Sequence, residues 1–175
     1  MTVWIVAESM FGNTREAGQQ IAAGIRYALP TTDVELHDVA KTPLVIPDEV
    51  TLLLVGGPTH AFGMSRESTR EEAHHRGSSA ETAMGVREWL DLISVSQPGL
   101  PVVAFDTRVD RRFVPGSAAK AIARRLRRLG CYLMEAPVTF YVDDIVGPLA
   151  DAEADRAFAF GQMVARDFER RGLVA

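Results

Sequence analysis

The chain has few cysteines, no long apolar run and little net charge, and each of these features excludes a class of protein. Its 175 residues contain one cysteine, Cys131, which excludes an internal disulfide and favours a reducing compartment, so we expect a cytoplasmic protein. No apolar run is long enough to cross a bilayer, and no basic stretch precedes the first apolar segment; neither a membrane span nor a secretion signal is expected. The modest net charge of −4 argues against general binding to nucleic acid.

Several common catalytic and nucleotide-binding motifs are also missing. The sequence has neither a phosphate loop ending in Gly-Lys-Ser/Thr nor a G-x-G-x-x-G dinucleotide fingerprint. It has no CxxC pair, no Ser-His-Asp elbow and no paired-carboxylate site. The adjacent His74 and His75 lack partners at metal-ligand spacing. We therefore name no catalytic residue and no metal ligand.

What the sequence contains is an alternation of apolar, strand-like segments with amphipathic, helix-like ones. Strands are expected at 3–7, 33–37, 51–55, 101–105 and, interrupted by Pro137, within 132–142. Helices are expected at 15–29, at 79–93 after a capping box of Ser78 and Glu81, at 117–129 and at 151–170. This alternation predicts a single α/β domain over residues 1–175. Its doubly wound, five-stranded parallel sheet would have the order 2-1-3-4-5, with helices on both faces.

The turn after the first strand is the most informative segment. It reads Glu8-Ser9-Met10-Phe11-Gly12-Asn13-Thr14 and leads directly into a helix. A helix N-terminus presents unpaired N–H groups and the positive end of the helix dipole, which suits a phosphate. Because the turn contains no lysine or arginine, neutral hydrogen-bond donors would hold that phosphate. The alternative is a turn that only caps the helix, a common use of Ser, Asn and Thr.

The segments after the third and fourth strands should complete the site. In doubly wound sheets the ligand lies beyond the C-terminal strand ends, where the winding direction reverses. The third strand is followed by Gly56-Gly57-Pro58-Thr59-His60-Ala61-Phe62-Gly63, whose glycines would let the backbone approach a flat ring. The fourth strand is followed by Asp106, Thr107 and Arg108, with Phe113 further on as the aromatic residue available for stacking.

Two of these segments carry a resemblance to a known family. The first turn resembles the phosphate loop of the flavodoxin superfamily, in the form Ser-x-aromatic-Gly-x-Thr. The segment 57–63 resembles a loop of the flavodoxin-like NAD(P)H:quinone oxidoreductases, with Ala61 as one extra residue. The resemblance implies a bound FMN, whose phosphate would be held by the turn residues Ser9, Met10, Phe11, Gly12, Asn13 and Thr14. The ring would be lined by Pro58, Thr59, His60, Ala61, Phe62 and Gly63, and at its other edge by Asp106, Thr107 and Arg108.

The resemblance implies an electron-transfer protein that serves a redox partner protein. The first alternative is an FMN-dependent NAD(P)H:quinone oxidoreductase with a second pocket over the flavin. The second is a flavin-free binding module, because the segment after the fourth strand departs from the Gly-rich, acidic, Tyr-containing loop usual in short-chain flavodoxins. A nearby Arg108 would stabilise the reduced flavin anion and raise its potential, whereas apolar packing would lower it. The oligomeric state is left open.

Two charged segments have more than one interpretation. The connection 63–80 has no apolar face, and it is either a lid over the flavin, a subunit contact or a solvated excursion with a short helix. The stretch 108–128 has eight basic residues and one acidic residue. The helix in this stretch could bind an acidic partner protein or the phosphates of a pyridine nucleotide. The alternative is that its basic side chains only face solvent.

Overall fold

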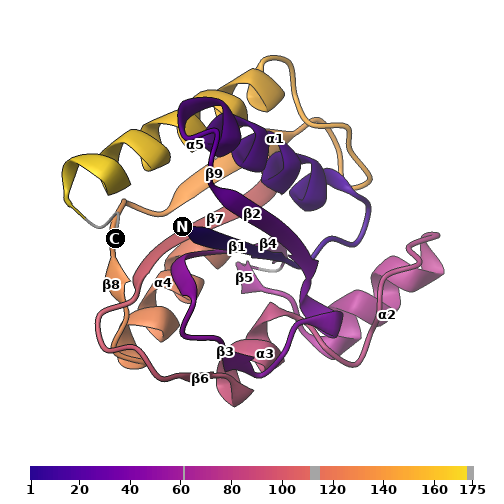
Figure 1. Cartoon of the computed structure of the whole chain (residues 1–175). Helices are drawn as coiled ribbons and strands as arrows, with labels where there is room; N and C mark the ends of the chain where they lie inside the picture. Colours follow the sequence, from indigo (N-terminus) through magenta and orange to yellow (C-terminus); the bar gives the residue numbers. More distant parts are fainter. Residues whose placement is uncertain (61, 111–114, 173–175) are drawn as a thin grey trace.

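The computed structural model describes residues 1–60, 62–110 and 115–172 and consists of a central parallel sheet between two helical layers (Figure 1). The main strands are β1 (Thr2–Ala7), β2 (Asp33–Asp38), β4 (Val50–His60), β7 (Pro101–Val109), β8 (Tyr132–Leu133) and β9 (Val138–Val142). They are ordered β2-β1-β4-β7, and β7 pairs first with β8 and then with β9. The predicted order 2-1-3-4-5 is confirmed, including the interruption of the fifth strand.

Helices cover both faces of the sheet. They are α1 (Asn13–Ala28), α2 (Glu67–His75), α3 (Val86–Leu92), α4 (Ala118–Arg128) and α5 (Glu153–Arg170). One apolar cluster joins the sheet to α1 and α5, and a second, which includes the buried Cys131, joins it to α3 and α4. Smaller elements are the 3-10 helix η1 (Val39–Lys41) and the short strands β3 (Val45–Ile46), β5 (Gly63–Met64) and β6 (Ser94–Val95). No helix in the described ranges is both long and apolar enough to cross a membrane.

Helices α1 and α5 pack side by side on one face (Figure 1), and two glycines allow their close approach. A Cβ atom on Gly24 would lie 2.1 Å from the carbonyl oxygen of Phe158. A Cβ atom on Gly161 would lie 2.2 Å from the carbonyl oxygen of Ile21. Both distances are far below van der Waals contact, so the two backbones touch. This pair holds α1, and therefore the turn before it, firmly against the sheet.

Strand β4 continues well beyond the predicted 51–55. Its residues Gly56, Gly57 and Pro58 pair in register with β7, and the chain then turns back through β5, which is antiparallel to β4. A Cβ atom on Gly56 would lie 2.2 Å from the ring of Phe105, and one on Gly57 would lie 3.0 Å from a methyl of Val86. These two glycines therefore make room for the protein's own core side chains.

The helix predicted at 79–93 begins only at Val86, so its first half was wrong. The Val86 N–H donates to the Glu8 carboxylate at 2.8 Å, which fixes the start of α3 beside the end of β1. The Gly85 N–H donates to Glu88 at 3.0 Å. Ser78 does not cap a helix with Glu81; its hydroxyl donates to the Met10 carbonyl at 2.6 Å and ties this segment to the first turn.

Candidate functional site

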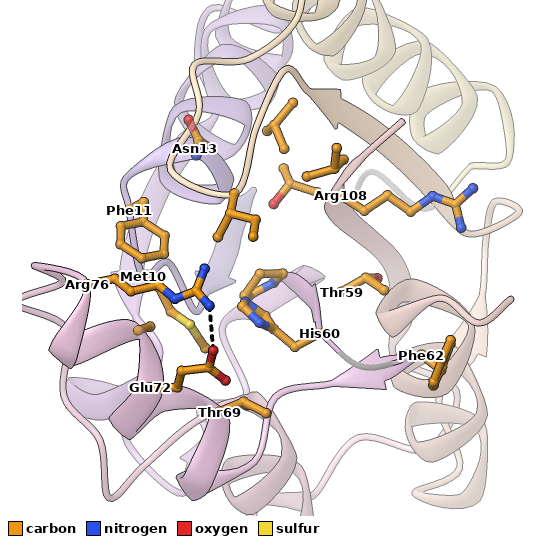
Figure 2. A pocket seen from close by; sticks show the side chains of 16 residues that line it. Met10, Phe11, Asn13, Thr59, His60, Phe62, Thr69, Glu72, Arg76 and Arg108 are labelled. Atoms are coloured by element: carbon orange, nitrogen blue, oxygen red, sulfur yellow. Dashed lines mark hydrogen bonds and ion pairs between the residues drawn. The ribbon is translucent and has the colours of Figure 1, made fainter. Parts of the chain in front are cut away.

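A cavity of about 420 Å³ opens at the C-terminal edge of the sheet (Figure 2). It lies where the winding reverses, next to the ends of β1 and β4, as expected for a doubly wound sheet. Its walls come from the first turn, the end of β4, helix α2, the end of β7 and the segment after β9. The lining residues are Met10, Phe11, Asn13, Pro58, Thr59, His60, Phe62, Thr69, Glu72, Ala73, Arg76, Thr107, Arg108, Val109, Val142 and Ile145.

The first turn offers backbone donors to this cavity. Gly12 adopts a left-handed conformation (φ 92°) at the start of α1, and the first helical bond runs from the Glu16 N–H to the Gly12 carbonyl at 2.9 Å. The Arg15 N–H donates to the Ser9 hydroxyl at 3.1 Å. In the described part of the chain, the backbone N–H groups of residues 10–14 donate to no protein acceptor. These free donors at a helix N-terminus suit an anion.

The side chains of Asn13 and Thr14 hold the turn in place. The Thr14 hydroxyl is buried and shares a 2.7 Å hydrogen bond with the Thr107 hydroxyl at the end of β7. The Asn13 amide donates to the Val146 carbonyl at 3.1 Å. The turn is thus fixed both to the sheet and to the segment after β9. The side chain of Thr14 does not line the cavity, and it is the backbone of this residue that remains free to donate.

His60 at the end of β4 and Phe62 just beyond it contribute an imidazole and a phenyl ring to the cavity. His60 is half-buried, and this burial lowers the pKa of His60; Arg76 reinforces the effect, and Glu72 opposes it. The imidazole is therefore neutral at neutral pH. Phe62 has a positive φ of 77° and lies at the rim with 62% of its surface exposed. Ala61 and Phe113, which were also predicted to meet the ligand, lie outside the described residues.

Asp106 does not line the cavity, contrary to the prediction. Its side chain is fully buried and points to the start of α4, where one carboxylate oxygen accepts from the Ser117 hydroxyl at 2.7 Å and the Ala119 N–H at 3.0 Å. The same oxygen accepts from the Thr59 hydroxyl at 2.7 Å, and the Thr59 hydroxyl accepts from the Ala118 N–H at 2.8 Å. Asp106 therefore fixes Thr59, which does line the cavity.

Arg108 lines the cavity only with the near part of its side chain. Its guanidinium donates to the Gly116 carbonyl at 3.0 Å and lies 5.7 Å from the centre of the Tyr141 ring. Figure 2 shows the charged end directed away from the other lining side chains. The expected influence of this charge on a bound flavin therefore has no geometric support.

Helix α2 forms a wall that the sequence did not predict. Thr69, Glu72, Ala73 and Arg76 line the cavity, although the segment was interpreted as a lid, a subunit contact or a solvated excursion. The helix is anchored by Arg70, which is only 2% exposed. Arg70 donates to the Thr82 carbonyl at 2.6 Å and to the Ser65 hydroxyl at 2.8 Å, and its guanidinium lies 3.1 Å from Glu88. A buried, hydrogen-bonded arginine makes α2 a fixed wall.

A second, more polar cavity of about 510 Å³ lies on the other side of the first turn. Ser9 and Gly12 line this second cavity, whereas Met10 and Phe11 line both. Gly63, in β5, lines neither. Of the predicted cofactor-binding residues, the structure brings Met10, Phe11, Asn13, Pro58, Thr59, His60, Phe62, Thr107 and Arg108 together around the first cavity.

No protein-family model and no curated protein sequence matches the chain, but solved structures resemble it over nearly their whole length. A flavodoxin from the domain Archaea has 20% sequence identity and a TM-score of 0.66, with 97% of this chain and 99% of that chain covered. Flavodoxin 1 from Bacillus cereus has 17% identity and a TM-score of 0.67 over 97% and 98% of the two chains. The chain has the flavodoxin-like fold. A flavodoxin, WrbA-like protein from Agrobacterium tumefaciens is also similar, with 13% identity, a TM-score of 0.61 and coverage of 97% and 98%. The fold predicted from the sequence is thereby confirmed.

In this flavodoxin-like fold, the residue before the first turn is a buried carboxyl group, Glu8. It is 3% exposed, and its second carboxyl oxygen finds no hydrogen-bond partner among the described residues. Burial raises the pKa of Glu8, and the Ser65 hydroxyl, the Val86 N–H and Arg70 only partly oppose the rise. The folded state therefore favours the protonated form.

We expect Glu8→Gln to flatten the pH dependence of stability. Folding raises the pKa of Glu8, so this residue contributes to the free energy of unfolding, fully so below its unfolded-state pKa of about 4.3. That contribution is lost as the pH rises through the folded-state pKa. Glutamine keeps an acceptor for the Val86 N–H and does not ionise. Urea unfolding across pH should thus show the variant gaining stability relative to wild type as pH rises. Glu71→Gln, at an exposed position of α2, is the control; parallel curves for Glu8→Gln and wild type would contradict the account.

Proposed function

We propose that the protein binds FMN non-covalently in the first cavity and transfers electrons. The observation that carries the proposal is one cavity lined both by residues of the first turn, Met10, Phe11 and Asn13, and by His60 at the end of β4. Its volume of about 420 Å³ lies within the usual range for small-molecule sites. The likeness to proteins named flavodoxins supports the same reading.

The residues present fit the two chemically different parts of FMN. The backbone donors of residues 10–14 suit a phosphate. Apolar side chains supply most of the remaining wall and suit a flat aromatic ring: Met10, Phe11, Pro58, Val109, Val142 and Ile145. Polar groups are few and fixed, because Thr59 is held by Asp106 and the neutral His60 is half-buried. This mixture is typical of a cofactor site.

The flavin would supply the redox chemistry, and the chain would bind, orient and shield it. Two apolar residues that line the cavity are exposed: Phe62 is 62% exposed and Ile145 is 39% exposed. Such exposed apolar side chains suit transient contact with a redox partner protein close to the cofactor. The cytoplasmic location and the single domain over 1–175 remain predictions that belong to this proposal.

An FMN-dependent NAD(P)H:quinone oxidoreductase is the second candidate. It is favoured by the polar residues Thr69, Glu72 and Arg76, which line the cavity and offer a second ligand polar groups to contact. A carrier needs a reductase protein, whereas this enzyme takes hydride directly from NAD(P)H. Bleaching of bound flavin by NAD(P)H alone, with turnover on a quinone, would favour the enzyme.

The visible absorption spectrum of the purified protein tests the proposal. We expect a bound-flavin spectrum either at once or after FMN is added and the excess removed. Flavin-free protein that retains no FMN at micromolar concentration would contradict the proposal. The first turn would then serve as a helix cap in a flavin-free module of the same fold.

A further inference from the structure

The cavity has a cationic side chain that approaches the first turn from a distant part of the sequence. Arg76 follows α2 directly, and it lines the same cavity as Met10, Phe11 and Asn13. Figure 2 shows its side chain reaching between Phe11 and His60. The first turn has no lysine or arginine of its own. Arg15, which follows the turn directly, lines the second cavity and not the first, so the fold brings Arg76 to the first cavity as a cation from another part of the chain.

Arg76 is the cation available to a ligand among the described lining residues. The other arginine, Arg108, has its guanidinium engaged with the Gly116 carbonyl and the Tyr141 ring, away from the cavity. The imidazole of His60 is neutral, because burial lowers its pKa. Arg76 and Glu72 line the same cavity as this imidazole.

Arg76 can exchange its ion-pair partner, the Glu72 carboxylate, for an anionic ligand. Its guanidinium lies 2.6 Å from Glu72 in a pair that spans one helical turn, and the two side chains are 48% and 63% exposed. Exposed pairs of this kind contribute little to stability, so replacing the carboxylate costs little. The backbone is fixed at the same time, because the Arg76 N–H donates to the Glu72 and Ala73 carbonyls and Arg70 anchors the helix. Only the end of the side chain has to move.

We propose that Arg76 is the specificity-determining cation of this site, and that it exchanges its ion pair with Glu72 for the phosphate of the ligand. The inference rests on the proposed function and adds to it the residue by which the site favours the phosphate monoester over its dephosphorylated form. A dianionic phosphate accepts stronger, two-point hydrogen bonds from a guanidinium than neutral groups do. In the free protein Glu72 competes for the guanidinium and thereby sets the affinity.

The test compares the dissociation constants of FMN and riboflavin, measured by quenching of flavin fluorescence. We expect Arg76→Gln to weaken FMN binding about 10- to 100-fold and to leave riboflavin binding nearly unchanged. Glu72→Gln should strengthen FMN binding by about twofold or more, because the competitor is gone. Arg76→Gln in the Glu72→Gln background measures the loss of the cation without an unpaired Glu72. Arg124→Gln, exposed on the far α4, makes the same change in net charge and should have no effect.

The outcomes separate this inference from the proposed function. If wild type binds FMN and Arg76→Gln binds it equally well, the inference fails and the proposed function stands. If Arg76→Gln weakens both flavins equally, Arg76 supports the cavity wall and does not select the phosphate. If wild type binds neither flavin, the proposed function fails, and the inference fails with it. Far-ultraviolet circular dichroism and unchanged riboflavin binding establish that the variants are folded.

Discussion

Replacing Arg70 with leucine is expected to lower the free energy of unfolding by about 3 kcal/mol, because it leaves buried partners without their donor. The substitution removes the hydrogen bonds to the Thr82 carbonyl and the Ser65 hydroxyl and the ion pair with Glu88. Since α2 contributes three lining residues to the cavity and Arg76 follows it directly, FMN affinity should fall together with stability. Chemical unfolding gives the first quantity and a flavin titration the second.

Arg66→Leu is the matched control for this prediction. Arg66 is exposed at the start of the same helix and loses the same charge. The control should unfold within about 0.5 kcal/mol of wild type. Equal stability of the two variants would mean that the buried guanidinium is not what anchors α2, and the description of α2 as a fixed wall would have to be abandoned.

Replacing Asp106 with alanine is the second prediction with a large effect. The carboxylate oxygen that this change removes accepts from two hydroxyl groups and one backbone N–H in a fully buried position. We expect a loss of about 3 kcal/mol, because several buried donors are left unsatisfied. Thr59 also loses the contact that orients it, so FMN binding should weaken as well. Thermal or denaturant unfolding measures the first effect.

Asp106→Asn distinguishes the effect of losing side-chain volume from the effect of losing the hydrogen-bond acceptor. Asparagine fills the same volume and keeps one oxygen, so its loss of stability should be smaller than that of alanine. Asp110→Ala, four residues further on and exposed, is the control and should be nearly neutral. If Asp106→Ala were as stable as Asp110→Ala, the hydrogen bonds to Asp106 would not hold the start of α4 or orient Thr59.

The sequence was sufficient to predict the layers of the fold and the edge of the sheet at which the cavity lies. Strands such as β1 and β4 are buried on both faces, so they read as continuous apolar runs that alternate with amphipathic helices. That pattern, with the rule on where the winding reverses, was enough to predict the strand order and the edge where the cavity lies. The turn at 8–14 could be recognised because its signal is local: small and polar residues between a strand and a helix.

The sequence was not sufficient where long-range polar contacts decide the structure. Helix α2 buries the charged side chain of Arg70 in place of an apolar stripe, so hydrophobic periodicity gave no signal for it. Strand β4 continues through Gly56 and Gly57, which look like a loop until the ring of Phe105 is known to lie beside them. The direction of Asp106 depends on hydroxyl groups at Thr59 and Ser117, which only the folded chain brings together.

The most direct test of the account is the set of backbone amide shifts in a nuclear magnetic resonance titration with FMN. We predict that the amides of residues 10–14, of Thr59 and His60 at the end of β4, and of residues 69–76 in and just after α2 shift together. Riboflavin should shift the last two groups and leave residues 10–14 largely unaffected. If shifts were confined to the second cavity, around 37–40 and 77–81, or if FMN shifted no amide, the placement of the cofactor in the first cavity would be wrong.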